Sequence, residues 1–377
     1  MTGLYVHIPF CNQICPYCDF YKMVVSDDLK NKYIDALINE MKIKDLKTKE
    51  INTLYIGGGT PSSLSLYLIE KLLFNLSLNI DLTSLSEFTF ECNPEDINKE
   101  LLDVLRKYHV SRLSIGIQTF KSDFQNLINR FTTVSKVYQI VKMLEEVGFK
   151  NYSFDLMYGF KNQTFEDVKL DIDTLIKFNP THISIYSLIV EERTLFGLRK
   201  SKDECLELSD EAQANIYLFI IDYLESLGYY QYETSNFSKE GYKSLHNLIY
   251  WNSDNYYSLG AGASSFIDNK RYLMNTKIHE YINDLLEFKM PSCYTENLSS
   301  NELIEEYIMM NLRKNEGLNV LKFKERFGLD FYEHFPGVID LLKSKVIDIN
   351  KDNISINKNY RYVANTIIVK IIMSMRE

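Results

Sequence analysis

The first half of the chain repeats one pattern six times, a short apolar run followed by a longer amphipathic stretch. The runs are rich in β-branched and aromatic residues and are bounded by Gly, Pro or Asn, which is typical of buried strands. Between them, apolar residues spaced three and four apart predict helices. Six repeats predict an α/β fold with a parallel sheet and outer helices, and leave open a partial barrel or an open doubly wound sheet. The predicted strands are 4–8, 53–57, 87–91, 111–118, 152–158 and 182–188, and the clearest helices are 66–76, 98–108, 135–147 and 165–178.

The pattern changes near residue 230. The stretch 230–266 is rich in Tyr, Asn, Ser and Gly and has few helical periods. Helices followed by a small hairpin then predict a winged-helix-like α+β appendage. We expect three segments: a core at 1–230, a connecting segment at 231–290 and a C-terminal domain at 291–377. The helices are predicted at 277–288, 301–313, 319–327 and 338–345. Two strands, at 346–350 and 353–357, are predicted to end the chain.

Charge and hydropathy limit the class of protein. The 377 residues include 42 basic and 51 acidic side chains, a net charge of −9, which argues against a nucleic-acid partner. No run is long and apolar enough to span a membrane, and the first residues do not resemble a signal peptide. We therefore expect a protein of the cytoplasm, free or peripheral at the membrane, where clustered Cys residues more often bind metals than form disulfides.

Three Cys residues fall within eight positions, at Cys11, Cys15 and Cys18, directly after the first predicted strand. Three thiolates on one short loop can hold a soft metal centre. Zinc would need a fourth ligand, for which His7 is a candidate, although His7 lies within the strand. A [4Fe–4S] cluster normally takes four Cys residues, so three would leave one iron open to a second molecule.

Further candidate residues follow the later strands. The run Gly57-Gly58-Gly59-Thr60-Pro61 allows close approach of a ligand to the backbone, with Thr60 and Pro61 expected to start a helical turn. In parallel β-α folds, ligands gather at the C-terminal ends of the strands. Polar side chains occur at or near those ends, and an Arg that could bind a carboxylate follows: Glu91, Gln118, Asp155 and Arg130.

The segment His246-Asn247-Leu-Ile-Tyr250-Trp251 contains the only Trp of the chain. A His beside aromatic residues can be an axial haem ligand or a hydrogen-bonded structural residue. The remaining Cys residues are scattered, and we interpret them as buried or free thiols: Cys92, Cys205 and Cys293.

Together, the Cys loop with its preceding Tyr5-Val-His-Ile-Pro-Phe run and the Gly-Gly-Gly-Thr-Pro turn resemble the radical SAM superfamily, and more narrowly the anaerobic coproporphyrinogen III oxidase family. The resemblance covers nearly the whole chain and implies a partial (β/α)6 TIM-like barrel. It implies a [4Fe–4S] cluster on Cys11, Cys15 and Cys18, whose open iron chelates S-adenosylmethionine for reductive cleavage to a radical. The positions matching the family's S-adenosylmethionine contacts are Tyr5, Tyr17, Gly58, Gly59, Thr60, Glu91, Gln118, Arg130 and Asp155.

Two departures separate the chain from the coproporphyrinogen dehydrogenases of this family. Those enzymes resemble Cys-x3-Cys-x2-Cys-x-Cys and carry an N-terminal extension, whereas here Phe20 occupies the fourth position and the first strand begins near Met1. The His-Asn-x-x-Tyr-Trp motif is similar instead to the haem-chaperone branch, HemW, and implies that His246 holds haem. That branch implies transfer of haem to an acceptor haemoprotein associated with a membrane.

Three functions follow from these observations. The first is a haem carrier, the second a radical enzyme acting on a tetrapyrrole, as a coproporphyrinogen III dehydrogenase or a haem-modifying methyltransferase, and the third a zinc protein. The sequence leaves the presence of enzymatic activity open, and also leaves open whether the chain forms a homodimer.

Overall fold

A computed structural model describes residues 1–375 and contains one twelve-stranded sheet with the order β12-β11-β10-β9-β1-β2-β3-β4-β5-β6-β8-β7. Its six central strands run parallel, and each begins and ends within one residue of its predicted bounds. The predicted partial barrel is therefore confirmed. The central strands are β1 (Gly3–Ile8), β2 (Thr53–Gly58), β3 (Glu87–Cys92), β4 (Arg112–Gln118), β5 (Asn151–Tyr158) and β6 (His182–Ser187).

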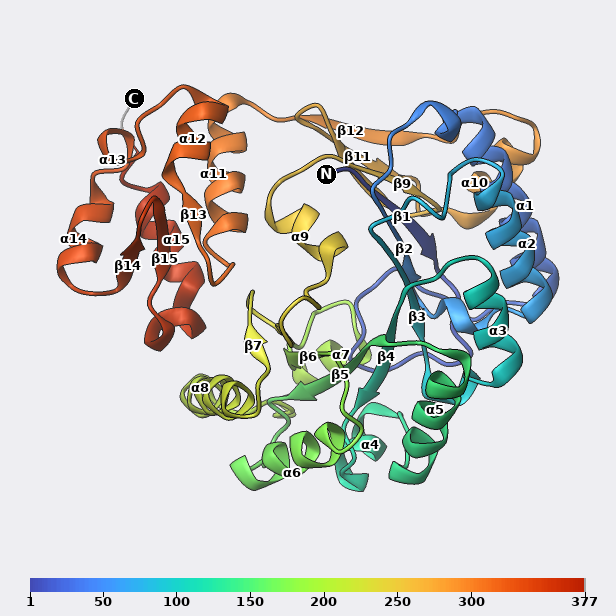
Figure 1. Ribbon diagram of the computed structural model, residues 1–377, viewed down its shortest axis with the longest axis horizontal. Helices are drawn as coiled ribbons and strands as arrows, with labels where there is room; N and C mark the ends of the chain where they lie inside the picture. The colour runs from blue at the N-terminus through green and yellow to red at the C-terminus, as the bar shows by residue number, and fades with distance from the viewer. Residues whose placement is uncertain (376–377) are drawn as a thin grey trace.

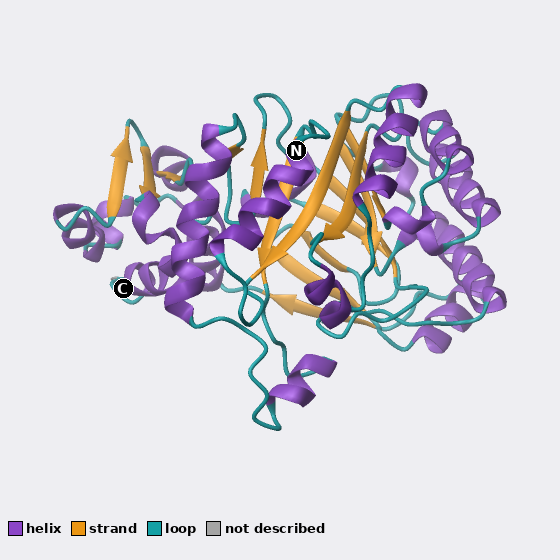
Figure 2. Cartoon of the chain, turned by 90° about the horizontal axis from the view of Figure 1, so that it is seen from below, coloured by secondary structure: helices purple, strands orange, loops and turns teal. Residues whose placement is uncertain are grey.

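Helices cover the outer face of this sheet, as Figure 2 shows. The amphipathic helices bury an apolar layer against the strands, in which Leu4, Ile56 and Phe90 are almost fully buried. Within residues 1–375 no helix is both long and apolar enough to cross a membrane. The helices of this half are α1 (Asp27–Ile43), α2 (Leu66–Ser77), α3 (Lys99–Lys107), α4 (Ser122–Ile128), α5 (Val134–Val147), α6 (Phe165–Ile176), α7 (Leu195–Lys200) and α8 (Asp210–Ser226).

The side chains that alternate with this apolar layer face the inside of the barrel, because successive residues of a strand point to opposite faces. On β4 this inner set is Arg112, Ser114, Gly116 and Gln118, while Leu113, Ile115 and Ile117 join the apolar core. The inside of the barrel is therefore polar, unlike the filled apolar centre of a closed eight-stranded barrel.

The sheet extends beyond the six predicted strands at both ends. β9 pairs in parallel with β1, and the other added strands pair antiparallel to their neighbours. The sequence pattern does not reveal these strands, because they have two to five residues each and mix polar with aromatic side chains. They are β7 (Tyr230–Gln231), β8 (Asn236–Ser238), β9 (Tyr256–Leu259), β10 (Ser264–Ile267), β11 (Lys270–Met274) and β12 (Cys293–Asn297).

The C-terminal domain has its own apolar core, whose buried residues run from Ile304 to Ile371. It lies on the far side of α9 (Leu245–Trp251) from β1 to β4 in Figure 1. The expectation that two strands end the chain was wrong, because a 3₁₀ turn and a helix rich in Ile follow the hairpin and complete this core. The remaining elements are α10 (Ile278–Leu286), α11 (Ser300–Asn311), β13 (Leu318–Asn319), α12 (Val320–Phe327), α13 (Phe331–His334), α14 (Gly337–Lys343), β14 (Ile347–Asn350), β15 (Asn353–Ile356) and α15 (Ala364–Ile372).

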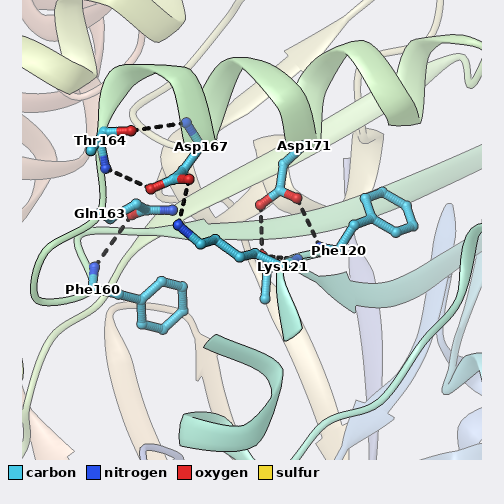
Figure 3. Close-up of polar contacts among 8 residues, drawn as sticks. Phe120, Lys121, Phe160, Gln163, Thr164, Asp167 and Asp171 are labelled. Atoms are coloured by element: carbon cyan, nitrogen blue, oxygen red, sulfur yellow. Dashed lines mark hydrogen bonds and ion pairs between the residues drawn. The ribbon is translucent and has the colours of Figure 1, made fainter. Parts of the chain in front are cut away.

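Residues of α6 hold the chain where it leaves β4, and Figure 3 shows their contacts with Phe120 and Lys121. The Asp171 carboxylate on α6 accepts hydrogen bonds from the Thr119 hydroxyl, at 2.7 Å, and from the Phe120 backbone, at 2.8 Å. One turn earlier, Asp167 forms a capping box with Thr164 and an ion pair with Lys121. Helix α6 thereby holds the segment that directly follows Gln118.

Candidate functional site at the C-terminal end of the barrel

The loop with the three Cys residues follows β1 and lies at the C-terminal end of the barrel. Backbone hydrogen bonds close its base, from Cys11 to Met23 (3.0 Å) and from Met23 to Pro9 (2.7 Å). The Cys11 side chain is buried, those of Cys15 and Cys18 are half-buried, and all three line one cavity of about 390 Å³. We call this the cluster cavity.

The donor groups around the three thiols fit a thiolate-bound cluster. The Thr60 hydroxyl donates to Cys11 Sγ at 3.6 Å, and Arg130 Nη1 donates to Cys15 Sγ at 4.0 Å. Burial raises the pKa of the Cys11 and Cys18 thiols, so a bound metal centre would be needed to hold them as thiolates at neutral pH. Among residues 1–375, no three His, Cys, Asp or Glu side chains gather tightly enough for a single metal ion.

The glycine-rich turn after β2 forms the next wall of the cluster cavity. Gly58 has φ +116°, and a Cβ atom there would lie 2.5 Å from the His7 ring, while a Cβ on Gly59 would lie 2.8 Å from the Phe10 carbonyl. Only glycine fits this geometry. Pro61–Ser63 form the expected helical turn, but the Thr60 side chain donates to Cys11 Sγ and makes no capping hydrogen bond.

Glu91 at the end of β3 holds this turn in place. Its carboxylate accepts hydrogen bonds from the Tyr55 hydroxyl, at 2.6 Å, and from the Gly58 backbone N–H, at 3.1 Å. Burial raises the pKa of Glu91 to about 7, although these two hydrogen bonds favour the ionised form. The residue is thus able to hold or release a proton near neutral pH.

The other polar residues predicted at the strand ends face the same cavity. Gln118 ends β4 at a bulge and has φ +71°. Asp155 accepts hydrogen bonds from Ser114 (3.0 Å) and Ser153 (3.2 Å), and burial raises its pKa. Arg130 is 8% exposed and donates to the Gly116 carbonyl at 2.8 Å. The carboxyl groups of Glu91 and Asp155 and the guanidinium of Arg130 suit a zwitterion that carries both an ammonium and a carboxylate.

The structure thus brings together most of the residues predicted from the sequence. The cluster cavity is lined by Cys11, Cys15, Cys18, Tyr17, Gly58, Gly59, Thr60, Glu91, Gln118, Arg130 and Asp155. Tyr5 lies apart from them, in a neighbouring hollow with Phe20 and Tyr250, where its hydroxyl bonds His7 Nδ1 at 2.9 Å. His7 uses its other ring nitrogen for the Tyr21 carbonyl, so neither nitrogen faces the thiols.

His246 does not lie with the cluster residues, because it sits near the N-terminal ends of β1, β2 and β3. Its Nδ1 bonds the Thr53 hydroxyl and its Nε2 bonds the Tyr250 hydroxyl, both at 2.8 Å. Glu87, the first residue of β3, accepts hydrogen bonds from the backbone N–H groups of Leu245 and His246. The His246 side chain is fully buried, and burial lowers its pKa to about 3, so the ring is neutral. Helix α9 is therefore attached to the inside of the barrel through His246.

Several residues of the cluster cavity were not predicted. Ser114 and Gly116 alternate with Gln118 on β4, so the period of two could have found them. Asn93 and Tyr186 also line the cavity. Tyr186 carries no comparable sequence signal, because its position depends on how the sheet curves.

Comparisons with known proteins agree with this architecture. Residues 5–175 match the model of the radical SAM superfamily, and residues 298–359 match the HemN C-terminal domain. In fold, the chain is similar to the structure described as coproporphyrinogen III oxidase (HemN) from Escherichia coli, a radical SAM enzyme, with a TM-score of 0.82. The similarity covers 99% of this chain and 89% of that one at 24% identity.

Two relatives match almost end to end, and both are named heme chaperone HemW. The protein from Lactococcus lactis is 35% identical over 99% of this chain and 97% of its own length. The protein from Bacillus subtilis is 36% identical over 94% of each chain. The chain therefore belongs to the HemN/HemW family of radical SAM proteins.

Proposed function

We propose that this chain is a haem carrier, which binds haem, a [4Fe–4S] cluster and S-adenosylmethionine, and transfers the haem to an acceptor haemoprotein associated with a membrane. The observation that carries the proposal is the near full-length similarity to two proteins named heme chaperone. It is supported by Phe20 at the position of a fourth Cys, where its side chain is 70% exposed at the rim of the cluster cavity.

In this proposal, Cys11, Cys15 and Cys18 hold the cluster, and the polar groups of the cluster cavity hold S-adenosylmethionine. The cluster would supply the electron for reductive cleavage when it is bound. Arg130 is suited to a carboxylate, Glu91 and Asp155 are suited to ammonium or hydroxyl groups, and the glycine turn allows the ligand to lie against the backbone.

The cluster assignment is tested by replacing each of the three Cys residues with Ser before anaerobic reconstitution with iron and sulfide. Each variant is expected to lose the four irons, because three thiolates are the minimum set in this loop. Cys205→Ser is the matched control, because Cys205 is exposed and lies outside the cavity. Full iron content in any of the three loop variants would contradict the assignment.

The carrier function is tested by titrating the reconstituted protein with haem and then adding an apo-globin as a haem trap. We expect saturable binding of one haem per chain and its release to the trap. An absence of saturable binding would overturn the proposal. Membrane vesicles that contain an apo-haemoprotein then replace the globin, to test transfer to a membrane-bound acceptor.

In this proposal, His246 is the haem ligand that the motif implies. The role of His246 is tested separately. Direct ligation needs α9 to move, because both ring nitrogens are already hydrogen-bonded. If His246 binds the iron, His246→Ala changes the visible spectrum of bound haem and weakens binding. An unchanged spectrum and affinity would remove His246 from the ligand set.

A radical enzyme acting on a tetrapyrrole is the second candidate, favoured by the complete set of polar groups in the cluster cavity. The test is anaerobic incubation of the reduced protein with S-adenosylmethionine and either coproporphyrinogen III or haem. A decarboxylated or methylated product would establish the enzyme. Formation of deoxyadenosine alone would exclude these two substrates.

A further inference from the structure

A second cavity, of about 520 Å³, lies between the barrel and the C-terminal domain, and we call it the interdomain cavity. Its volume falls within the range of about 300–1,000 Å³ that is usual for ligand sites. Three parts of the fold form its walls: Tyr186 and the turn between β7 and β8, helix α9, and the C-terminal segments that carry Arg313 and Arg361. None of the residues assigned to the cluster or to S-adenosylmethionine lines it.

Two guanidinium groups face this cavity without a carboxylate partner within residues 1–375. Arg313 donates to the Asn365 side chain at 2.9 Å, and Arg361 donates to the Gln231 side chain at 2.8 Å, so both partners are neutral amides. Burial lowers the pKa of both groups, which means that an anion reaching them would gain from their partial desolvation. Two half-buried guanidiniums on one cavity wall suit a ligand with two carboxylates.

Aromatic residues also line the cavity, and two of them belong to the motif of α9. Tyr250 and Trp251 line the cavity, and Tyr362 from the C-terminal domain faces it as well. Flat aromatic side chains are suited to a flat conjugated ligand. His246 does not line the cavity, but its Nε2 forms a hydrogen bond with the hydroxyl of Tyr250, which does. The motif therefore has one residue that anchors the helix and two that face the cavity.

One acidic side chain, Glu233, also lines the cavity. Glu233 is 1% exposed, and its Oε1 has no hydrogen-bond partner among the described residues. Burial raises the pKa of Glu233 to about 7, which favours the neutral carboxylic acid more than at an exposed Glu. Asn236 Oδ1 in the same wall also lacks a partner. An ionised Glu233 would repel a carboxylate ligand, whereas a protonated Glu233 can donate a hydrogen bond to it.

We propose that the interdomain cavity is the seat of the tetrapyrrole, with Arg313 and Arg361 binding the two propionate carboxylates of haem and the aromatic wall of α9 contacting the ring. This inference rests on the proposed haem-carrier function. It also places haem beside the cluster cavity, because Tyr186 lines both cavities.

The test compares haem with haem dimethyl ester, in which both propionates are blocked, and uses the reconstituted full-length protein. Binding is followed by quenching of Trp251, the only Trp of the chain. We expect the wild type to bind haem at least tenfold more tightly than the diester. The double variant R313Q/R361Q is expected to bind haem at least tenfold more weakly than the wild type and to bind the diester unchanged. R313K/R361K, which keeps both charges, should recover part of the haem affinity.

The control variant is R326Q, because Arg326 also joins the C-terminal domain to the loop after α9, through the Ser253 carbonyl at 3.1 Å, but lies outside this cavity. It should bind haem like the wild type. The assignment of the cavity would be overturned if the wild type bound haem and its diester with equal affinity. It would also be overturned if R313Q/R361Q bound haem as tightly as the wild type. Neither result would affect the carrier function. An absence of haem binding by the wild type would overturn the carrier function as well.

Discussion

At the scale of single residues, the site depends on positions where no other side chain fits. Gly58 combines a positive φ with a neighbouring His7 ring, and Glu91 fixes its backbone N–H. The sequence predicted this turn as a ligand contact, and the structure adds the reason that each glycine is required. The direction of a side chain was harder to predict. Tyr5 and His246 were expected to contact ligands. Instead, the Tyr5 hydroxyl and both His246 ring nitrogens form hydrogen bonds with neighbouring side chains.

Gly58→Ala is expected to destabilise the protein by at least about 2 kcal/mol, because the new Cβ would clash with His7 and the backbone has φ +116°. Gly148→Ala is the matched control, because Gly148 also has a positive φ but has open space around it. It should cost only about 1 kcal/mol. Urea unfolding measures both, and equilibrium dialysis should show that only Gly58→Ala loses S-adenosylmethionine binding. Equal effects of the two substitutions would contradict the steric argument.

His246 predicts a dependence of stability on pH. Its folded-state pKa of about 3 lies below the ordinary value of 6.5, so between these values the unfolded chain binds more protons than the folded one. Stability is therefore full above pH 6.5 and falls as the pH drops, by up to about 1.4 kcal/mol per pH unit from this residue. His246→Gln should destabilise the protein at pH 7.5, and the difference from the wild type should narrow at pH 5.

Urea unfolding of the apoprotein at pH 7.5 and pH 5 provides the measurement. His279→Gln, on an exposed position of α10, controls for the loss of a His residue. Stability curves for His246→Gln and the wild type that stay parallel across this range would show that folding does not lower the pKa of His246.

At the scale of elements, the strands that could be predicted are those with an apolar face against the helices. β1 to β6 have this face, whereas β9 to β12 are short and rich in polar and aromatic residues. The helix α15 was missed after the hairpin, although its Ile residues complete the C-terminal core. The interdomain cavity could not be predicted at all, because Arg313 and Arg361 reach it only through the packing of one domain on the other.

The contact between α6 and the end of β4 yields a prediction for ligand binding. Asp171→Ala removes both oxygens that accept hydrogen bonds from Thr119 and Phe120 (Figure 3) and should cost about 1–3 kcal/mol. It should also weaken S-adenosylmethionine binding severalfold, because the bulge at Gln118 loses its support. Thr164→Ala, which removes only the cap of the same helix, should cost about 1 kcal/mol and leave binding unchanged. Urea unfolding and equilibrium dialysis distinguish the two, and unchanged binding in Asp171→Ala would refute the link.

At the scale of the whole molecule, the core of the barrel and the core of the C-terminal domain meet at a boundary with several polar contacts. The contacts between them include Lys314 with Asn252 (2.6 Å), Arg361 with Gln231 (2.8 Å) and Lys358 with Glu225 (2.8 Å). Such boundaries contribute less to stability than apolar cores do. The C-terminal core should therefore open before the barrel.

Hydrogen exchange followed by mass spectrometry is expected to show lower protection in 300–372 than in β2 to β5. Haem at 100 times its dissociation constant should raise protection in the C-terminal core by about 2.7 kcal/mol, if the ligand bridges both cores. S-adenosylmethionine should not have this effect, because it is assigned to the barrel alone. Equal protection of the C-terminal core and the barrel, both without and with haem, would contradict the prediction that the C-terminal core opens first.

Segments from distant parts of the chain form the interdomain cavity, and this limits how the family can evolve. Helix α9, the turn after β7 and the segment around Arg361 belong to different parts of the chain, yet they must fit one cavity. A substitution on one side alters a surface that the other sides have to match. Chimeras that exchange the C-terminal domain between relatives should therefore keep the cluster but lose haem binding, unless the partner residues on α9 are exchanged with it.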